Sequence, residues 1–257
     1  MNMLKVIIED TKNEIDKKKR LNPIENLLKV GNEKRRDFKN IFKRESMALI
    51  AEIKRSSPST GTIINGLNPD KIATIYETSG ADGISVVTNE RFFDGKNEDI
   101  KIVKKSTILP VLRKDFVIDE YQIYESYGID ADAILLIASI LSPGRLKEFV
   151  RRAHNLGMTT IVEVHTINDL KKALDTDTEI IGINNRNLNN FEVNINVSLH
   201  LVQLVPDGYY TVSESGIRKK EDVKRLKDAG FDGILVGTSI LKADDMAEKI
   251  KELKWID

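Results

Sequence analysis

The chain has 257 residues, and 40% of them are hydrophobic, which is enough for a sizeable core at this length. Its 40 Lys and Arg residues equal its 40 Asp and Glu residues, and this balance argues against a general nucleic-acid or membrane-surface binder. No cysteine is present, so disulfides, thiolate nucleophiles and Cys-ligated metals are excluded together.

Targeting and metal-binding signals are also missing from the sequence. The three histidines, His154, His165 and His200, are scattered without the spacing of a metal motif. Residues 1–20 are charged throughout and have no apolar signal-peptide core, and no apolar run approaches the roughly 18 residues of a membrane span. We therefore expect a soluble cytoplasmic protein with no metal, no cofactor, no nucleic-acid partner and no membrane partner.

The first part of the chain differs from the rest in composition and in the pattern of its apolar residues. Residues 1–45 are rich in Lys, Glu and Asn, and predict two or three amphipathic helices that form an N-terminal extension. After Ser46, eight short apolar runs follow, and their lack of in–out alternation is typical of parallel strands covered on both faces. They begin at Met47, Gly83, Pro110, Ala133, Thr159, Glu179, Tyr209 and Gly233.

Charged stretches with a helical period lie between these runs. Clear examples are residues 70–79, 143–154, 167–174, 219–229 and 243–253. Helix-start signals are Asn68 before Pro69, Ser142 before Pro143, and Thr166 with Asp169 three residues later. Gly80, Gly157 and Gly230 stand where helices should end.

Eight alternating strand–helix units predict an α/β fold with a parallel sheet. At this length the sheet should close into a single (β/α)₈ TIM barrel over residues 1–257, with the N-terminal helices as an extension. A faint repeat supports the count, because G-A-D-G-I-S-V-V from Gly80, D-A-D-A-I-L-L-I from Asp130 and G-F-D-G-I-L-V-G from Gly230 share one build. A doubly wound open sheet is the alternative.

In such a barrel the active site lies at the carboxyl ends of the strands. Six of the eight runs end in polar groups, which include Glu52, Lys54, Lys114, Glu163, Asn184, Arg186 and Glu214. Glu52 and Lys54 are two residues apart, so a strand directs both to one side. A lone charge at a strand end is usually a solvated cap, and a structural salt-bridge network is an alternative for the set. Glu163 fits a cap least, because it lies between Val162 and Val164.

The last two strands carry a different signal. Ser215-Gly216 and Gly237-Thr238 are small-residue turns, expected at the starts of the following helices, where backbone N–H groups and a helix dipole attract anions. Loops after strands seven and eight commonly bind phosphate in this fold. The polar loop 55–63 after the first strand is either a lid or an ordinary surface loop.

These residues also carry a family resemblance, in blocks that run in order from Met47 to Leu241. The chain resembles the indole-3-glycerol phosphate synthase family in AEIKRSSPSTG from Ala51, PVLRKDFVIDEYQIYE from Pro110, IVEVHT from Ile161, IGINNRNL from Ile181, SESGI from Ser213 and GILVGTSIL from Gly233. The resemblance implies cofactor-free decarboxylation, ring closure and dehydration of 1-(2-carboxyphenylamino)-1-deoxyribulose 5-phosphate in tryptophan biosynthesis. It also implies that the partner is a small phosphorylated substrate. We expect the enzyme to be a monomer.

The resemblance further implies a role for each matching residue. Lys114 matches the general acid, Glu163 the general base, and Lys54 the lysine that binds the substrate carboxylate and has also been proposed as an acid. Glu52 and Asn184 match groups that orient the intermediate, and Arg186 and Glu214 match further polar positions. Phe93, Phe116 and Leu135 match the apolar walls. Ser57, Ser215, Gly216, Gly237 and Thr238 match the phosphate site, with Thr238 where the family often has Ser.

Two other readings of the site remain open from the sequence. Another phosphate-binding barrel enzyme, a phosphosugar isomerase or an aldolase with Lys114 as a Schiff-base lysine, would use a similar mouth. A barrel that has lost catalysis and serves as a binding protein is the non-enzyme alternative. For acid–base chemistry we expect that neighbouring cations lower the pKa of one active-site lysine and that burial raises the pKa of a glutamate.

Overall fold

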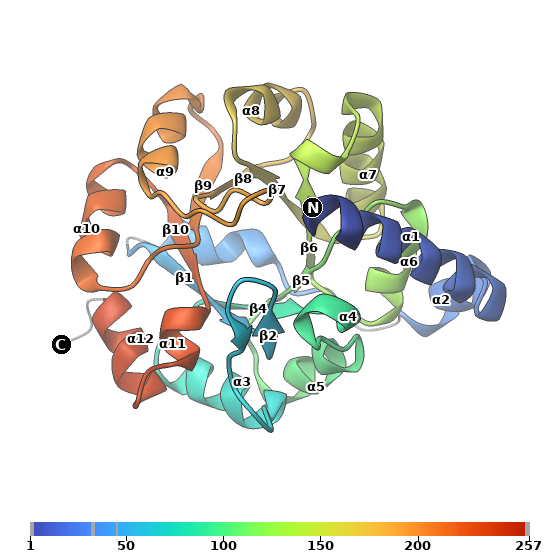
Figure 1. The fold of residues 1–257 in the computed structure, drawn as a ribbon, viewed down its shortest axis with the longest axis horizontal. Coiled ribbons are helices and arrows are strands. Elements are labelled where there is room, and N and C mark those ends of the chain that lie inside the picture. Colours follow the sequence, from blue (N-terminus) through green and yellow to red (C-terminus); the bar gives the residue numbers. More distant parts are fainter. Residues whose placement is uncertain (1–2, 32–33, 45, 255–257) are drawn as a thin grey trace.

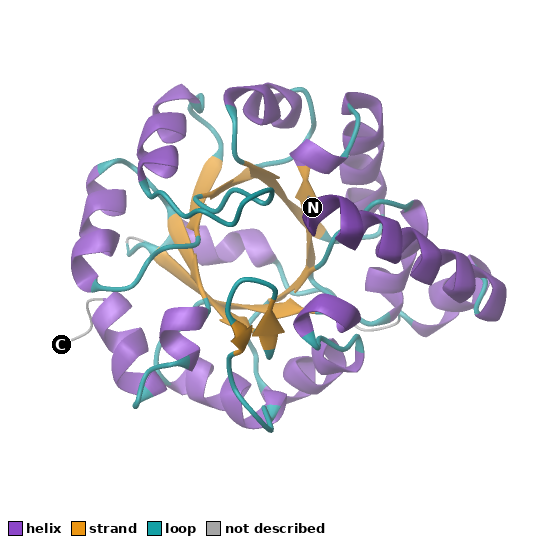
Figure 2. Cartoon of the chain, in the orientation of Figure 1, coloured by secondary structure: helices purple, strands orange, loops and turns teal. Residues whose placement is uncertain are grey.

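The computed structural model describes residues 3–31, 34–44 and 46–254; positions 1, 2, 32, 33, 45 and 255–257 of the predicted domain lie outside them. Eight parallel strands form a closed barrel in the order β1-β10-β9-β8-β7-β6-β5-β4 (Figures 1 and 2). The strands are β1 (Ala48–Ile53), β4 (Gly83–Val87), β5 (Val111–Lys114), β6 (Ala133–Ile137), β7 (Thr159–Val164), β8 (Ile180–Asn184), β9 (Tyr210–Glu214) and β10 (Gly233–Val236). The predicted TIM barrel is confirmed, and the closed sheet rules out the doubly wound alternative.

A ring of helices surrounds the barrel (Figure 2). It comprises α3 (Pro69–Thr78), α4 (Glu90–Phe93), α5 (Glu98–Ser106), α6 (Glu120–Gly128), η2 (Ala138–Ile140), α7 (Pro143–Asn155), α8 (Ile167–Leu174), α9 (Asn196–Leu201), η3 (Val202–Leu204), α10 (Lys220–Asp228), α11 (Thr238–Leu241) and α12 (Met246–Lys254). The side chains of Asn68, Ser142 and Thr166 cap α3, α7 and α8 as predicted, and Thr166 forms a capping box with Asp169.

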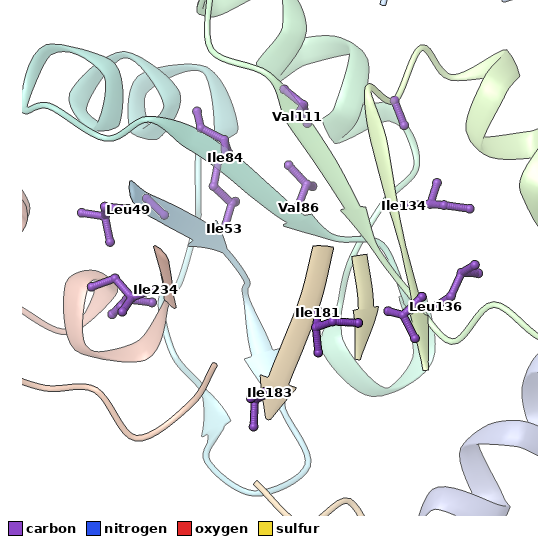
Figure 3. Packing of buried hydrophobic residues seen from close by; sticks show 14 of the residues in the cluster. Leu49, Ile53, Ile84, Val86, Val111, Ile134, Leu136, Ile181, Ile183 and Ile234 are labelled. Carbon is purple, nitrogen blue, oxygen red and sulfur yellow. The ribbon is translucent and has the colours of Figure 1, made fainter. Parts of the chain in front are cut away.

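Successive strand residues point alternately into the barrel and out towards the helices. The outward set packs under the helix ring, and Figure 3 shows part of it, including Leu49, Ile84 and Ile134. The inward set fills the barrel interior; it includes Ala48, Ile50, Leu112, Ala133, Leu135, Ile161, Ile180, Val212 and Leu235. Both faces are apolar, which explains the absence of alternation in the sequence.

The N-terminal extension contains α1 (Met3–Leu21), α2 (Ile24–Val30) and the 3₁₀ helix η1 (Phe38–Lys43). Phe38, Ile41 and Phe42 of η1 pack with the inward core residues and close the amino end of the barrel. At the other end, α1 runs outward from the barrel mouth past α6 (Figure 1). None of the helices in the described ranges is long and apolar enough to cross a membrane.

Candidate active site

The inward rows of strands β1, β5 and β7 end in charged groups at the carboxyl end of the barrel. Two residues after inward-facing Ile50 comes Glu52, and the same step leads from Leu112 to Lys114 and from Ile161 to Glu163. The side-chain period of two therefore directs these groups into one pocket. Except for Glu214, every predicted site residue lines this cavity of about 150 Å³: Glu52, Lys54, Ser57, Phe93, Lys114, Phe116, Leu135, Glu163, Asn184, Arg186, Ser215, Gly216, Gly237 and Thr238.

The two lysines of the pocket pair with carboxylates in two separate groups. The ammonium of Lys54, directly after β1, contacts the Glu52 carboxylate of that strand. The Lys114 ammonium contacts the Glu214 carboxylate and lies 3.6 Å from Glu163 Oε2. Glu214 is fully buried beneath Lys114, whereas Glu163 faces the cavity. Glu163 is therefore the carboxylate of this second group that a ligand can reach.

These pairings set the protonation states in the pocket. Burial lowers the pKa of Lys114, but Glu214, Glu163 and Glu52 outweigh it and raise this pKa well above its ordinary value. The expectation of a lysine with a lowered pKa is wrong for Lys114, because carboxylates rather than cations surround it. Burial raises the pKa of Glu214 to about 7, against the effect of Lys114. Burial also raises the pKa of Glu52, but Lys54 and Lys114 outweigh it and the net pKa is lowered.

The raised pKa of Glu214 predicts how stability depends on pH. Between pH 4.5 and about 7 the folded protein holds a proton on Glu214 that the unfolded chain has released, so this group lowers stability as pH rises. We expect Glu214→Gln to remove a slope of about 1 kcal/mol per pH unit from this window. The free energy of unfolding, measured by denaturant titration at pH 5, 6 and 7, checks this. If the free energy of unfolding changed with pH in the same way in the variant and the parent, the prediction would be contradicted.

Gly182 of β8 makes room for the carboxylate of Glu214, which lies on the neighbouring strand β9. A Cβ atom at Gly182 would overlap Glu214 Oε1 and come within 3.0 Å of Ile161. Glu214 Oε1 is also buried without a hydrogen-bond partner among the described residues. The sequence offered no signal for Gly182, since a glycine within a strand has several possible causes.

The turns after β9 and β10 differ from each other. Ser215 and Gly216 have φ angles of 68° and 80°, and both residues of this turn line the pocket. They do not start a helix, because α10 begins only at Lys220; this part of the prediction is wrong. Thr238 is the first residue of α11, and N–H groups of a first helical turn have no acceptor within the helix.

An aromatic wall stands on another side of the cavity. The rings of Phe93, at the end of α4, and Phe116, after β5, lie 6.0 Å apart between centroids. Leu135 of β6 lines the same cavity. Leu4 and Ile7 of α1 also line it, which could not be predicted from the sequence, because an apolar helix face does not reveal where it docks.

Two loops approach each other across the mouth. The loop after β1 carries a short hairpin of β2 (Ser56–Ser57) and β3 (Gly61–Thr62), which the sequence did not predict. Arg186, after β8, donates from Nη1 to the Phe191 carbonyl oxygen at 3.0 Å and to Ser59 Oγ of the hairpin loop at 3.4 Å. The loop 55–63, for which the sequence left a lid and an ordinary surface loop open, therefore contacts the rim of the pocket.

The barrel and this pocket define the chain as a (β/α)₈-barrel enzyme, since catalysis in that fold takes place where the strands end. A family model described as indole-3-glycerol phosphate synthase matches residues 4–253. The chain belongs to the indole-3-glycerol phosphate synthase family, and its enzyme class is that of the carboxy-lyases.

Individual relatives agree with the family model. The chain is 46% identical over 250 residues to an indole-3-glycerol phosphate synthase from Caldanaerobacter subterraneus subsp. tengcongensis, with 97% of this chain and 96% of the relative covered. It is 40% identical over 251 residues to one from Thermoanaerobacter pseudethanolicus, with the same coverage of 97% and 96%. A solved 3-hexulose-6-phosphate synthase from Salmonella typhimurium aligns with a TM-score of 0.65 over 81% of this chain and 97% of that chain; at 15% identity it shows the fold alone.

Proposed function

We propose that the pocket converts 1-(2-carboxyphenylamino)-1-deoxyribulose 5-phosphate into indole-3-glycerol phosphate, with loss of CO₂ and water. The observation that carries this proposal is the position of Lys114, between buried Glu214 and cavity-facing Glu163. A charged proton donor and a carboxylate base thus meet in one cavity that also has an aromatic wall. This combination suits an aromatic substrate that closes a ring.

Lys114 acts as the general acid in this proposal. Attack of the aromatic ring carbon on the substrate ketone forms the C–C bond and places negative charge on the ketone oxygen. The raised pKa of Lys114 keeps its ammonium protonated until this alkoxide, a much stronger base than an amine, has formed beside it. The same pKa disfavours the Schiff-base alternative, because a Schiff base needs the neutral amine as nucleophile.

Glu163 acts as the general base, and its neighbours orient the intermediate. CO₂ leaves from the ring carbon that attacked, and dehydration then removes one proton and the former ketone oxygen as water. Glu163 faces the cavity near Lys114, so one carboxylate and one ammonium can serve both proton transfers. His165 Nδ1 donates a hydrogen bond of 2.7 Å to the backbone carbonyl oxygen of Asn184. This bond holds the end of β8 in position.

Lys54 and the aromatic wall hold the anthranilate part of the substrate. Lys54 contacts Glu52, and a substrate carboxylate would provide a second negative partner. Phe93, Phe116 and Leu135 offer flat and apolar surface to the ring. Pinning a long substrate at its carboxylate and its phosphate brings the reacting carbons together. The predicted site residues meet within a single chain, so we propose that a monomer is sufficient for activity.

The phosphate would bind at the turns of Ser215-Gly216 and Gly237-Thr238, with Ser57 from the hairpin. We expect Gly216→Ala to raise KM by about 10-fold or more with a smaller fall in kcat, because the lost contact is made in the ground and transition states alike. The φ of 80° strains any side chain there, and a Cβ would lie 2.6 Å from Val193. Ser215→Ala, which keeps the backbone, is the milder control. Sulfate or product bound elsewhere in a crystal would contradict this site.

The function is tested by adding the carboxyphenylamino-deoxyribulose phosphate and following indole absorbance together with CO₂ release. Both should appear with equal stoichiometry. We expect EDTA to leave the rate unchanged, because lysine and glutamate carry the proton transfers. A loss of rate that a divalent metal restores would contradict cofactor-free chemistry. Borohydride trapping with a phosphosugar tests the aldolase alternative, and no turnover of either substrate would favour the binding-protein alternative.

A further inference from the structure

Arg113 is the charged residue of β5 that faces away from the pocket. It precedes Lys114 in the strand, so its side chain points outward, where its partners on the two neighbouring strands are Val86 and Ile134. Its side chain is 1% exposed. A guanidinium is costly to bury, so its hydrogen-bond partners need an explanation.

Every N–H group of this guanidinium has an acceptor. Nε donates to Thr88 Oγ1 at 3.0 Å. Nη1 donates to the Gln122 carbonyl oxygen at 3.2 Å and to Ser126 Oγ at 2.9 Å. Nη2 donates to Asp115 Oδ2 at 3.2 Å and to Glu125 Oε2 at 2.6 Å. The five donors of the planar fork are thus used by the end of β4, the turn after β5 and helix α6.

Asp115 extends these contacts to the backbone on the far side of Lys114. Its Oδ2 accepts from Thr88 Oγ1 at 2.6 Å, as well as from Arg113. Its Oδ1 accepts from the Phe116 backbone N–H at 2.8 Å. The residues directly before and after Lys114 are therefore tied to each other, and the turn that carries Phe116 is tied to both.

Thr88 links the same contacts to the other aromatic residue. It lies between the end of β4 and Asn89, whose side chain caps α4 by accepting from the Phe92 N–H at 3.2 Å. Phe93 ends this one-turn helix. Both rings of the aromatic wall are thus carried by segments that meet at Thr88 and Asp115.

Outside the barrel the contacts reach the N-terminal helix. Glu125 of α6 also lies 3.0 Å from the Lys18 ammonium of α1, and Lys18 lies 2.6 Å from Glu14. The same α1 places Leu4 and Ile7 over the pocket. A continuous chain of charges through α6 therefore connects the end of β5 with α1, and both of these segments border the ligand cavity.

We propose that Arg113, Asp115 and Thr88 form a positioning network that fixes Lys114 and the Phe93–Phe116 wall relative to each other; this rests on the proposed function. Buried ion pairs add little net stability compared with apolar residues, so stability alone does not account for the network. Fixed geometry does, because displacement of a reacting group by about 1 Å can cost on the order of 10²-fold in rate. None of the three residues needs to touch the substrate for this effect.

Thr88→Val tests the network, with Thr160→Val as the matched control. The first change keeps the shape but removes the hydroxyl that bonds Arg113 and Asp115. Thr160 is also a buried threonine, near the amino end of β7, and its hydroxyl lies 3.1 Å from both His154 Nε2 and Thr178 Oγ1. We expect both variants to lower Tm by similar amounts. Only Thr88→Val should lower kcat, by about 10-fold or more, with KM changed by less than the fall in kcat.

Hydrogen exchange at the Phe116 amide gives a second readout that needs no turnover. Exchange should be faster in Thr88→Val than in the parent and unchanged in Thr160→Val. Normal kcat in Thr88→Val, or an equal fall in both variants, would overturn the proposal, as would unchanged exchange at Phe116. If the parent itself lacks the proposed activity, the proposed function fails, while the exchange comparison still decides whether the network holds this turn.

Discussion

Lys114→Met should reduce kcat by roughly 10²- to 10⁴-fold, the usual range for a positioned acid or base, with KM within a few-fold of the parent value. The ammonium is needed only when negative charge develops on the ketone oxygen, so its loss acts on the transition state. The variant should still fold, because Glu214, whose pKa is already raised to about 7, takes up a proton when its cationic neighbour is removed. Steady-state rates at saturating substrate provide the measurement.

Lys54→Met is the natural contrast to this variant. Lys54 directly follows β1 and pairs with Glu52 rather than with Glu163 or Glu214. We expect removal of the Lys54 ammonium to weaken the binding of a carboxylate-bearing substrate analogue more than the binding of indole-3-glycerol phosphate, which has lost that carboxylate. If Lys54→Met weakened the binding of both ligands equally, or if Lys114→Met had normal turnover, the division of roles between the two lysines would be contradicted.

Glu163→Gln should lower turnover by roughly 10²-fold or more with little change in Tm. Glutamine keeps the shape and most hydrogen bonding but removes the basic oxygen. The structural alternative treats Glu163 as an ion-pair partner of Lys114. The contacts argue against it, because Glu163 is the more distant partner at 3.6 Å while Glu214 makes the close contact.

The comparison of Glu163→Gln with Glu214→Gln separates these two readings. Glu214 does not line the cavity, so Glu214→Gln should change the protonation of the buried group and the stability of the protein more than the chemical step. A large loss of Tm with near-normal turnover in Glu163→Gln would assign it to the salt-bridge network instead.

Much of this architecture follows from the sequence, because strand ends and cap residues are local signals. The eight apolar runs match the eight strands, and Glu52, Lys54, Lys114 and Glu163 reach one pocket through side-chain parity alone. The roles assigned to them rest on the family resemblance and stay predictions.

Features that depend on distant segments were not accessible in this way. The pKa of Lys114 is set by Glu214, 100 residues later in the chain, and its direction reverses the expectation from neighbouring cations. The docking of α1 over the pocket and the outward network of Arg113 likewise require knowledge of which elements touch. The prediction of a helix directly after Ser215-Gly216 was wrong for a local reason, because turn residues indicate a bend but do not determine where the next helix begins.

The alternation of inward and outward residues limits how the strands of this barrel can change in evolution. Point substitutions on the inward row, such as at Asn184, alter the cavity and leave the neighbouring outward residue Ile183 under its helices. Deleting one residue within β8 would instead exchange the two rows beyond the deletion, moving the amide into the apolar layer and an isoleucine into the cavity. Variation in length should therefore collect in the loops, and divergence of this chain towards new substrates should proceed by substitution at every second strand position.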